Sequence, residues 1–169
     1  NIVQRQLHEH ISIDDSRQML IDLGYDREMV SGIACCIRGT EIDYSTGLPR
    51  RKVGSREAKI VSDADLSNPG FYDVTNFAFE SIKLWFELDK FDISEFTQKG
   101  ADFTNKFFNN IGDYYTAAAR CLFSENRTNN MLALQKEIER IMEFCKGDPV
   151  VLQNMILQDD RRIIKLSTI

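Results

Sequence analysis

Apolar residues recur at intervals of three and four along most of this chain, and few helix-breaking residues interrupt them. Only three prolines and nine glycines occur among the 169 residues. An apolar residue at every third or fourth position forms one stripe on an α-helix, whereas a strand needs strict alternation. No alternating stretch is long enough to matter. The sequence therefore predicts an all-α fold, a helical bundle, as a single domain over residues 1–169.

The turn residues between the apolar stripes place the expected helices. Gly24 stands where a helix commonly ends, Asp26 can cap the next helix, and Pro69 with Gly70 ends another. Residues 40–54, with two glycines, a proline and a basic run, are expected to form a loop. The expected helices span residues 3–23, 27–39, 55–66, 71–88, 93–108, 114–123 and 124–145, and a last apolar stretch covers residues 150–157.

Charge and composition exclude several classes of protein. The chain has 21 basic and 26 acidic residues, a net charge of −5, which argues against binding of a nucleic-acid backbone. No apolar run approaches the roughly 18 residues that cross a membrane. The four cysteines contain no C-x-x-C pattern, and we interpret them as small buried hydrophobic residues in a reducing compartment. Cytoplasm is therefore the expected location.

Two aspartates stand in a partly apolar helical segment, Ile60-Val61-Ser62-Asp63-Ala64-Asp65-Leu66. A carboxylate there is costly unless it is paired or bound to a cation. Residues two apart point roughly 200° apart on a helix, so at most one of Asp63 and Asp65 faces a common site. Two interpretations stay open: a structural role, such as capping or pairing with Arg or Lys, and a role in binding a cation.

Two further polar clusters also have two interpretations each. His8 and His10 are two residues apart, whereas two metal ligands on one helix face are four apart. This spacing does not suit a pair of ligands and favours surface positions for the two histidines. Glu9 between them shares a face with Ser12 and with Ile13. The run Arg50-Arg51-Lys52 in the expected loop can bind an anionic substrate or simply be solvated.

The order of three sequence blocks resembles the HD-domain metal-dependent phosphohydrolases, in particular a bacterial subgroup with a DADL motif. HEHISI at residues 8–13 is similar to an early family helix, and EAKIVSDADL at 57–66 resembles the subgroup's EAKILxDADL segment. ADLSNP at 64–69 is also similar to the eukaryotic cyclic-nucleotide phosphodiesterases of the same superfamily. YYTAAAR at 114–120, followed by Asn129 or Asn130, resembles a late block. The resemblance covers about residues 7–144.

The resemblance implies an HD-domain-like helical fold around one or two divalent metals such as Mn, Mg, Fe or Zn. On this mapping Asp65 is a metal ligand, Asp63 is an outer neighbour that orients a ligand or water, and Glu9 borders the site. The implied function is hydrolysis of a nucleotide or another small phosphate ester by a water that the metal activates. Arg50, Arg51 and Lys52 are the candidates for binding the substrate.

One departure from the family is large. Its first histidine and its His-Asp doublet have no counterpart here, because His8 and His10 are the only histidines and no His-Asp dipeptide occurs. We expect either that the N-terminal part of the domain is missing or that the chain is a non-catalytic regulatory or interaction module on the same scaffold. As it stands, the chain is expected to hold no stoichiometric transition metal and to self-associate, for example as a homodimer.

Overall fold

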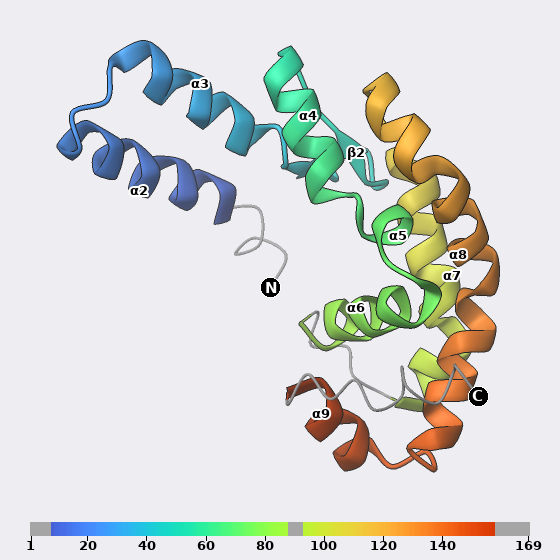
Figure 1. Cartoon of the computed structure of the whole chain (residues 1–169). Helices are drawn as coiled ribbons and strands as arrows, with labels where there is room; N and C mark the ends of the chain where they lie inside the picture. The colour runs from blue at the N-terminus through green and yellow to red at the C-terminus, as the bar shows by residue number, and fades with distance from the viewer. Residues whose placement is uncertain (1–7, 88–92, 158–169) are drawn as a thin grey trace. The chain divides into compact units, whose positions relative to one another are not determined.

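The computed structural model describes residues 8–87 and 93–157, and it confirms the all-α class. Eight helices and two strands of two residues each occur in these ranges (Figure 1). Their bounds are α2 His8–Asp22, α3 Arg27–Arg38, β1 Ile42–Asp43, β2 Arg50–Arg51, α4 Arg56–Asp65, α5 Asn68–Phe71, α6 Val74–Glu87, α7 Ile93–Ile111, α8 Ala117–Phe144 and α9 Pro149–Leu157.

Contacts divide the described chain into two compact units. The first comprises the described residues up to Leu66 together with Asn110–Arg120. The second comprises the described residues from Ser67 to Asn109 and from Cys121 onward. A single domain over residues 1–169 stays a prediction.

In the first unit, α2 and α3 lie side by side as an antiparallel pair (Figure 1). The turn between them contains Gly24 at φ +82°, a left-handed conformation that glycine adopts without steric cost. Asp26 caps α3, because its carboxylate accepts the amide of Met29 at 2.8 Å. Both features agree with the sequence prediction.

Helix α3 and helix α4 approach each other closely at Gly39. A Cβ atom on Gly39 would lie 2.9 Å from the Cβ of Ala58, closer than two such atoms pack. Glycine at this position therefore permits the contact between the two helices. The segment between them contains a short antiparallel ladder that pairs Ile42 with Arg51 and Asp43 with Arg50, where the sequence predicts an irregular loop.

In the second unit, aromatic side chains of α6 and α7 form much of the core. Trp85 lies against Phe96 and Phe103 with ring centroids 5.5 and 5.3 Å apart, and Phe77 lies 5.8 Å from Phe108. This matches the expectation that the aromatic stripes are core material. Helix α8 runs antiparallel to α7 and contributes the buried residues Leu134, Ile138, Ile141 and Met142.

Helix α8 corrects the sequence analysis at one point. Residues 114–123 and 124–145 are expected to form two helices, but the structure has one helix from Ala117 to Phe144, and Tyr114 to Thr116 precede it. No glycine or proline occurs between Thr116 and Phe144, so nothing breaks the helix. Thr116 caps it, since its hydroxyl accepts the Ala119 amide at 3.2 Å.

The short helix α5 is a further element that the sequence pattern does not predict. Its carbonyl groups are held by two asparagines one turn apart on α8. Asn130 donates to the carbonyls of Pro69 and Tyr72 at 2.8 and 2.7 Å, and Asn126 donates to those of Gly70 and Tyr72 at 2.9 Å each. These bonds give partners to carbonyl groups that a helix as short as α5 cannot satisfy internally, so the turn forms despite the Pro69-Gly70 sequence.

Several expected features fall outside the described residues or at their edge. Residues 3–7 of the first expected helix, Leu88 at the end of the fourth, and the charged end at 159–162 lie outside them. The side chain of His8 is also outside the description. In the described ranges, no helix is long and apolar enough to cross a membrane.

One buried acidic side chain connects two helices of the second unit. Glu137 on α8 is 9% exposed and accepts the Thr75 hydroxyl of α6 at 2.6 Å. Arg140 donates to the same carboxylate through Nε at 3.0 Å and Nη2 at 2.6 Å. Burial acts to raise the pKa of Glu137, but the bonds from Arg140 and Thr75 outweigh it and hold the pKa below its ordinary value.

The lowered pKa of Glu137 predicts a pH-dependent stability. The unfolded chain binds this proton more readily, so the contribution is present above the ordinary pKa of about 4.3 and is lost as the pH falls through the lower folded value. Glu137→Gln is expected to cost about 2 kcal/mol at pH 7 and less at pH 3.5. Urea unfolding of both proteins at the two pH values measures this, and a gap of constant size would contradict it.

Candidate functional site

Helix α4 carries the two aspartates and begins at a well-formed cap. The Ser55 hydroxyl accepts the Ala58 amide at 3.1 Å, and Glu57 lies in the positive first turn. At the other end of α4, Asp63 is 2% exposed whereas Asp65 is exposed. The two carboxylates therefore point to different sides of the helix, as their spacing predicts.

Asp63 is held by hydrogen bonds from two distant segments of the first unit. Its Oδ1 accepts Nη1 of Arg51 at 3.0 Å and the amide of Tyr115 at 2.8 Å. Its Oδ2 accepts the amide of Thr116 at 2.8 Å. We call this arrangement of Arg51, Asp63 and the two amides the Asp63 clamp. For Asp63, the structure thus shows the structural alternative, pairing with an arginine.

Arg51 makes further contacts within the same unit. Its Nε donates to the carbonyl of Ile111 at 3.3 Å, and its Nη2 donates to the carbonyl of Asp113. The guanidinium lies 4.0 Å from the ring centroid of Tyr115, whose hydroxyl donates to the Arg51 carbonyl at 3.4 Å. The side chains of Arg51 and Asp63 are each 3% exposed. Arg51 is therefore not the exposed loop residue that the sequence indicates.

The clamp keeps Asp63 ionised. Burial acts to raise the pKa of the Asp63 carboxyl group, since water no longer solvates the charge. Hydrogen bonds from the Tyr115 and Thr116 amides, the Thr116 side chain and Arg51 outweigh burial, so the pKa lies below its ordinary value. The charges of Arg51 and Asp63 compensate each other inside the unit.

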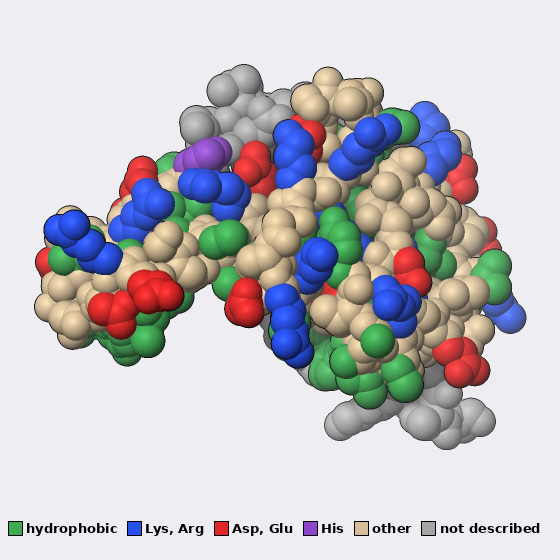
Figure 2. Space-filling view, turned by 90° about the horizontal axis from the view of Figure 1, so that it is seen from above, with side chains coloured by type: hydrophobic (Ala, Val, Ile, Leu, Met, Phe, Trp, Pro, Cys, Tyr) green, Lys and Arg blue, Asp and Glu red, His purple; other side chains and the backbone are tan. Residues whose placement is uncertain are grey.

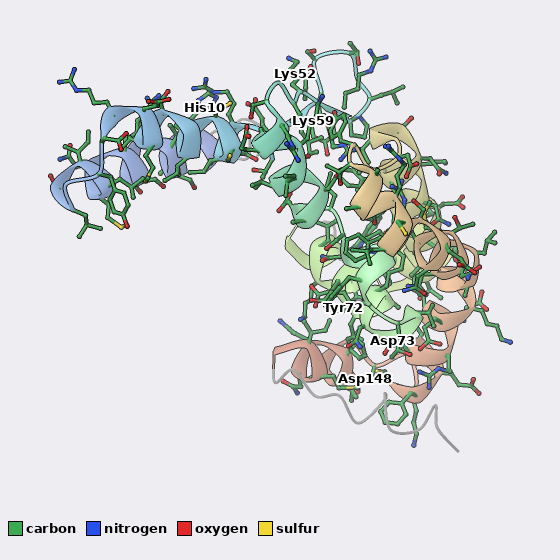
Figure 3. The ribbon with its side chains drawn as sticks, turned by 45° about the horizontal axis from the view of Figure 1, so that its top comes forward. His10, Lys52, Lys59, Tyr72, Asp73 and Asp148 are labelled. Atoms are coloured by element: carbon green, nitrogen blue, oxygen red, sulfur yellow. The ribbon has the colours of Figure 1, made fainter. Side chains whose placement is uncertain are left out.

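The neighbouring cations of the basic run lie at the surface. Arg50 is exposed, and Lys52, with a side chain 68% exposed, forms an ion pair with Asp43 at 2.7 Å. The ammonium group of Lys59 on α4 lies 5.9 Å from the centroid of the Tyr115 ring. Figure 3 labels Lys52 and Lys59. Binding of a substrate by Arg50, Arg51 and Lys52 stays a prediction, and Arg50 and Lys52 are its accessible members.

The cluster at the start of α2 is split between interior and surface. Glu9 is 8% exposed and shares its buried face with Ile13, which is 2% exposed. His10 is exposed, as Figure 3 shows on α2. The described structure thus supports the shared face of Glu9 and Ile13, and it separates Glu9 from the solvent-facing His10.

The described residues do not by themselves fit a divalent metal. Among them, no group of three or more His, Cys, Asp or Glu side chains lies together in a way that could hold an ion. The Asp63 oxygens already accept hydrogen bonds from Arg51, Tyr115 and Thr116, and Asp65 supplies one carboxylate. Transition metals take imidazole or thiolate ligands together with carboxylates, so a metal at Asp65 needs ligands beyond these residues.

Sequence reasoning missed the partners of Asp63. Tyr115 and Thr116 are 52 and 53 residues away and act through their backbone amides, which leave no signal in side-chain chemistry. The available signal was the cap residue Thr116 directly before an uninterrupted helical stretch.

Comparison with protein-family models, curated proteins and solved structures found no match to this chain.

The clamp predicts unequal effects for the two aspartates. Asp63→Asn leaves the buried guanidinium of Arg51 without its counter-charge and is expected to lower the free energy of unfolding by about 3 kcal/mol. The matched variant Asp65→Asn changes an exposed residue two positions later and is expected to cost less than about 1 kcal/mol. Urea unfolding at pH 7 measures both, and equal losses would contradict the structural role of Asp63.

Proposed function

We propose that this chain belongs to a metal-dependent phosphohydrolase of the HD superfamily and contributes Asp65 to its metal centre. The proposed substrate is a nucleotide or another small phosphate ester. The order of the HEHISI, EAKIVSDADL and YYTAAAR blocks supports the proposal. The structure corrects the expectation that the cysteines are buried, because Cys35 and Cys121 are exposed and only Cys145 is buried. All four are free thiols, which is typical of a reducing compartment, and we propose the cytoplasm.

The different surroundings of Asp63 and Asp65 are the observation that carries this proposal. The resemblance gives Asp65 the role of a ligand and Asp63 the role of an outer neighbour. In the structure the Asp63 carboxylate is buried and accepts hydrogen bonds from Arg51 and from the backbone amides of Tyr115 and Thr116, while Asp65 is exposed near the end of the same helix. An exposed carboxylate is accessible to a cation from solution, whereas a buried one held in this way orients the helix.

The chemistry that a divalent metal supplies in such sites is general. A bound metal would lower the pKa of a water ligand and would offset the negative charge of a phosphate ester. Within this chain, Asp65 would provide a carboxylate ligand, and Glu9 is the proposed contact at the border of the site. The exposed Arg50 and Lys52 are proposed to attract the anionic substrate from solution.

Substitution of Asp65 tests the proposal in the full-length protein. Asp65→Ala is expected to abolish stoichiometric Mn²⁺ binding in calorimetry and hydrolysis of bis(p-nitrophenyl) phosphate. Asp63→Ala is expected to leave measurable Mn²⁺ binding, because its oxygens serve the clamp.

Glu57→Ala is the matched control, since Glu57 is an exposed carboxylate on the same helix. This variant is expected to retain both Mn²⁺ binding and hydrolysis. The assignment would be rejected if Asp65→Ala retained Mn²⁺ binding and hydrolysis. It would also be rejected if the unsubstituted protein showed neither.

A second function, a non-catalytic interaction module, is favoured by one observation in the first unit. Large apolar side chains are exposed around the α2–α3 turn: Met19 60%, Leu23 67%, Tyr25 47% and Met29 48%. Figure 2 shows hydrophobic side chains along one edge of this pair of helices, beside acidic ones. Such a group of apolar residues is typical of an interaction site, and a second copy of the chain is the proposed partner.

The mass of the chain in solution tests this second function. Light scattering after size exclusion is expected to give twice the 19.5 kDa mass of one chain. Leu23→Asp is expected to shift the protein to the monomer, because it places a charge in the apolar group. Leu132→Asp on α8, where Leu132 is 81% exposed, is the matched control and is expected to change nothing. A monomer at all concentrations would contradict the interaction.

A further inference from the structure

Arg51 lies at the end of β2 and connects three segments of the first unit. Its guanidinium contacts Asp63 on α4, the carbonyl of Ile111 at the end of α7, and the carbonyl of Asp113 between α7 and α8. Its backbone belongs to the hairpin that pairs β1 with β2. A single buried side chain thus donates hydrogen bonds to one carboxylate and two carbonyl groups.

The carboxylate that Arg51 holds belongs to the last turn of α4. Within this turn the Leu66 amide donates to the Ser62 carbonyl at 3.2 Å. The ends of helices fray easily, because their last carbonyl groups lack partners within the helix. Asp63 opposes fraying by attaching the turn to the Tyr115 and Thr116 amides. Asp65 lies in the same turn, two residues further on.

We propose that Arg51 is a positioning residue that fixes the last turn of α4, and with it Asp65, by holding Asp63 against residues 111–116. This role differs from the substrate binding that the basic run suggests for Arg51. An effect of Arg51 on a reaction rests on the proposed function of Asp65, whereas the positioning of the helix turn is independent of that function. The exposed Arg50 and Lys52 have no part in it.

Amide hydrogen exchange tests the positioning without any metal or substrate. In Arg51→Met, the amides of Asp65, Leu66, Tyr115 and Thr116 are expected to exchange about tenfold faster or more, because the clamp loses its charged partner. The amides in the middle of α2 and α3 are expected to keep their rates. A role in overall stability alone would instead accelerate exchange throughout the unit.

Arg50→Met is the matched control, since it removes the neighbouring cation from the same strand without touching the clamp. Arg51→Lys is expected to give an intermediate acceleration, because an ammonium group keeps the charge but cannot reach Asp63 and both carbonyls together. It also serves as the test if Arg51→Met does not fold.

Two results would overturn the proposal. One is an acceleration at Leu66 that is no larger in the Arg51 variants than in Arg50→Met. The other is an equal acceleration across α2, α3 and α4. The exchange pattern is independent of the Mn²⁺ measurements on Asp65→Ala, so a failure of the positioning role and a failure of the proposed function are distinguishable.

Discussion

Burial of a guanidinium and a carboxylate removes hydration worth several kcal/mol per ion, and an isolated pair recovers this only with further hydrogen bonds. Arg51 and Asp63 meet this condition. Asp63 accepts two backbone amides in addition to Arg51, and Arg51 donates to two carbonyl groups and lies over the Tyr115 ring. The hairpin, α4 and the residues before α8 are joined by these contacts, so the local structure around Asp65 depends on them.

The second unit uses the same principle with different residues. Glu137 is buried between α8 and α6, where Thr75 and Arg140 satisfy its oxygens. Asn126 and Asn130 hold the carbonyl groups of α5 from one face of α8. Both units thus combine an apolar core with a few buried polar groups that have defined partners, which selects one arrangement of the helices over others that bury the same apolar stripes.

The helices were largely predictable from sequence, because their signals are local. Asp26 and Gly24 marked the turn between α2 and α3, and apolar spacing identified the buried face of α8. The division of α8 into two helices was wrong, since no breaker lies near Ser124. The clamp was not predictable, because Arg51 and Asp63 are 12 residues apart and the amides of Tyr115 and Thr116 are more than 50 residues from Asp63. Such pairings depend on tertiary structure, and the proposed roles of Asp65 and Glu9 stay predictions.

The central claim is that the Asp63 carboxylate accepts the Tyr115 and Thr116 amides inside the first unit. Scalar coupling through a hydrogen bond, between an amide nitrogen and the side-chain carboxyl carbon of Asp63, measures this directly by NMR on the labelled protein. The account predicts couplings from both amides to Asp63 and none to Asp65. Absent couplings, together with rapid exchange of both amides with water, would contradict it.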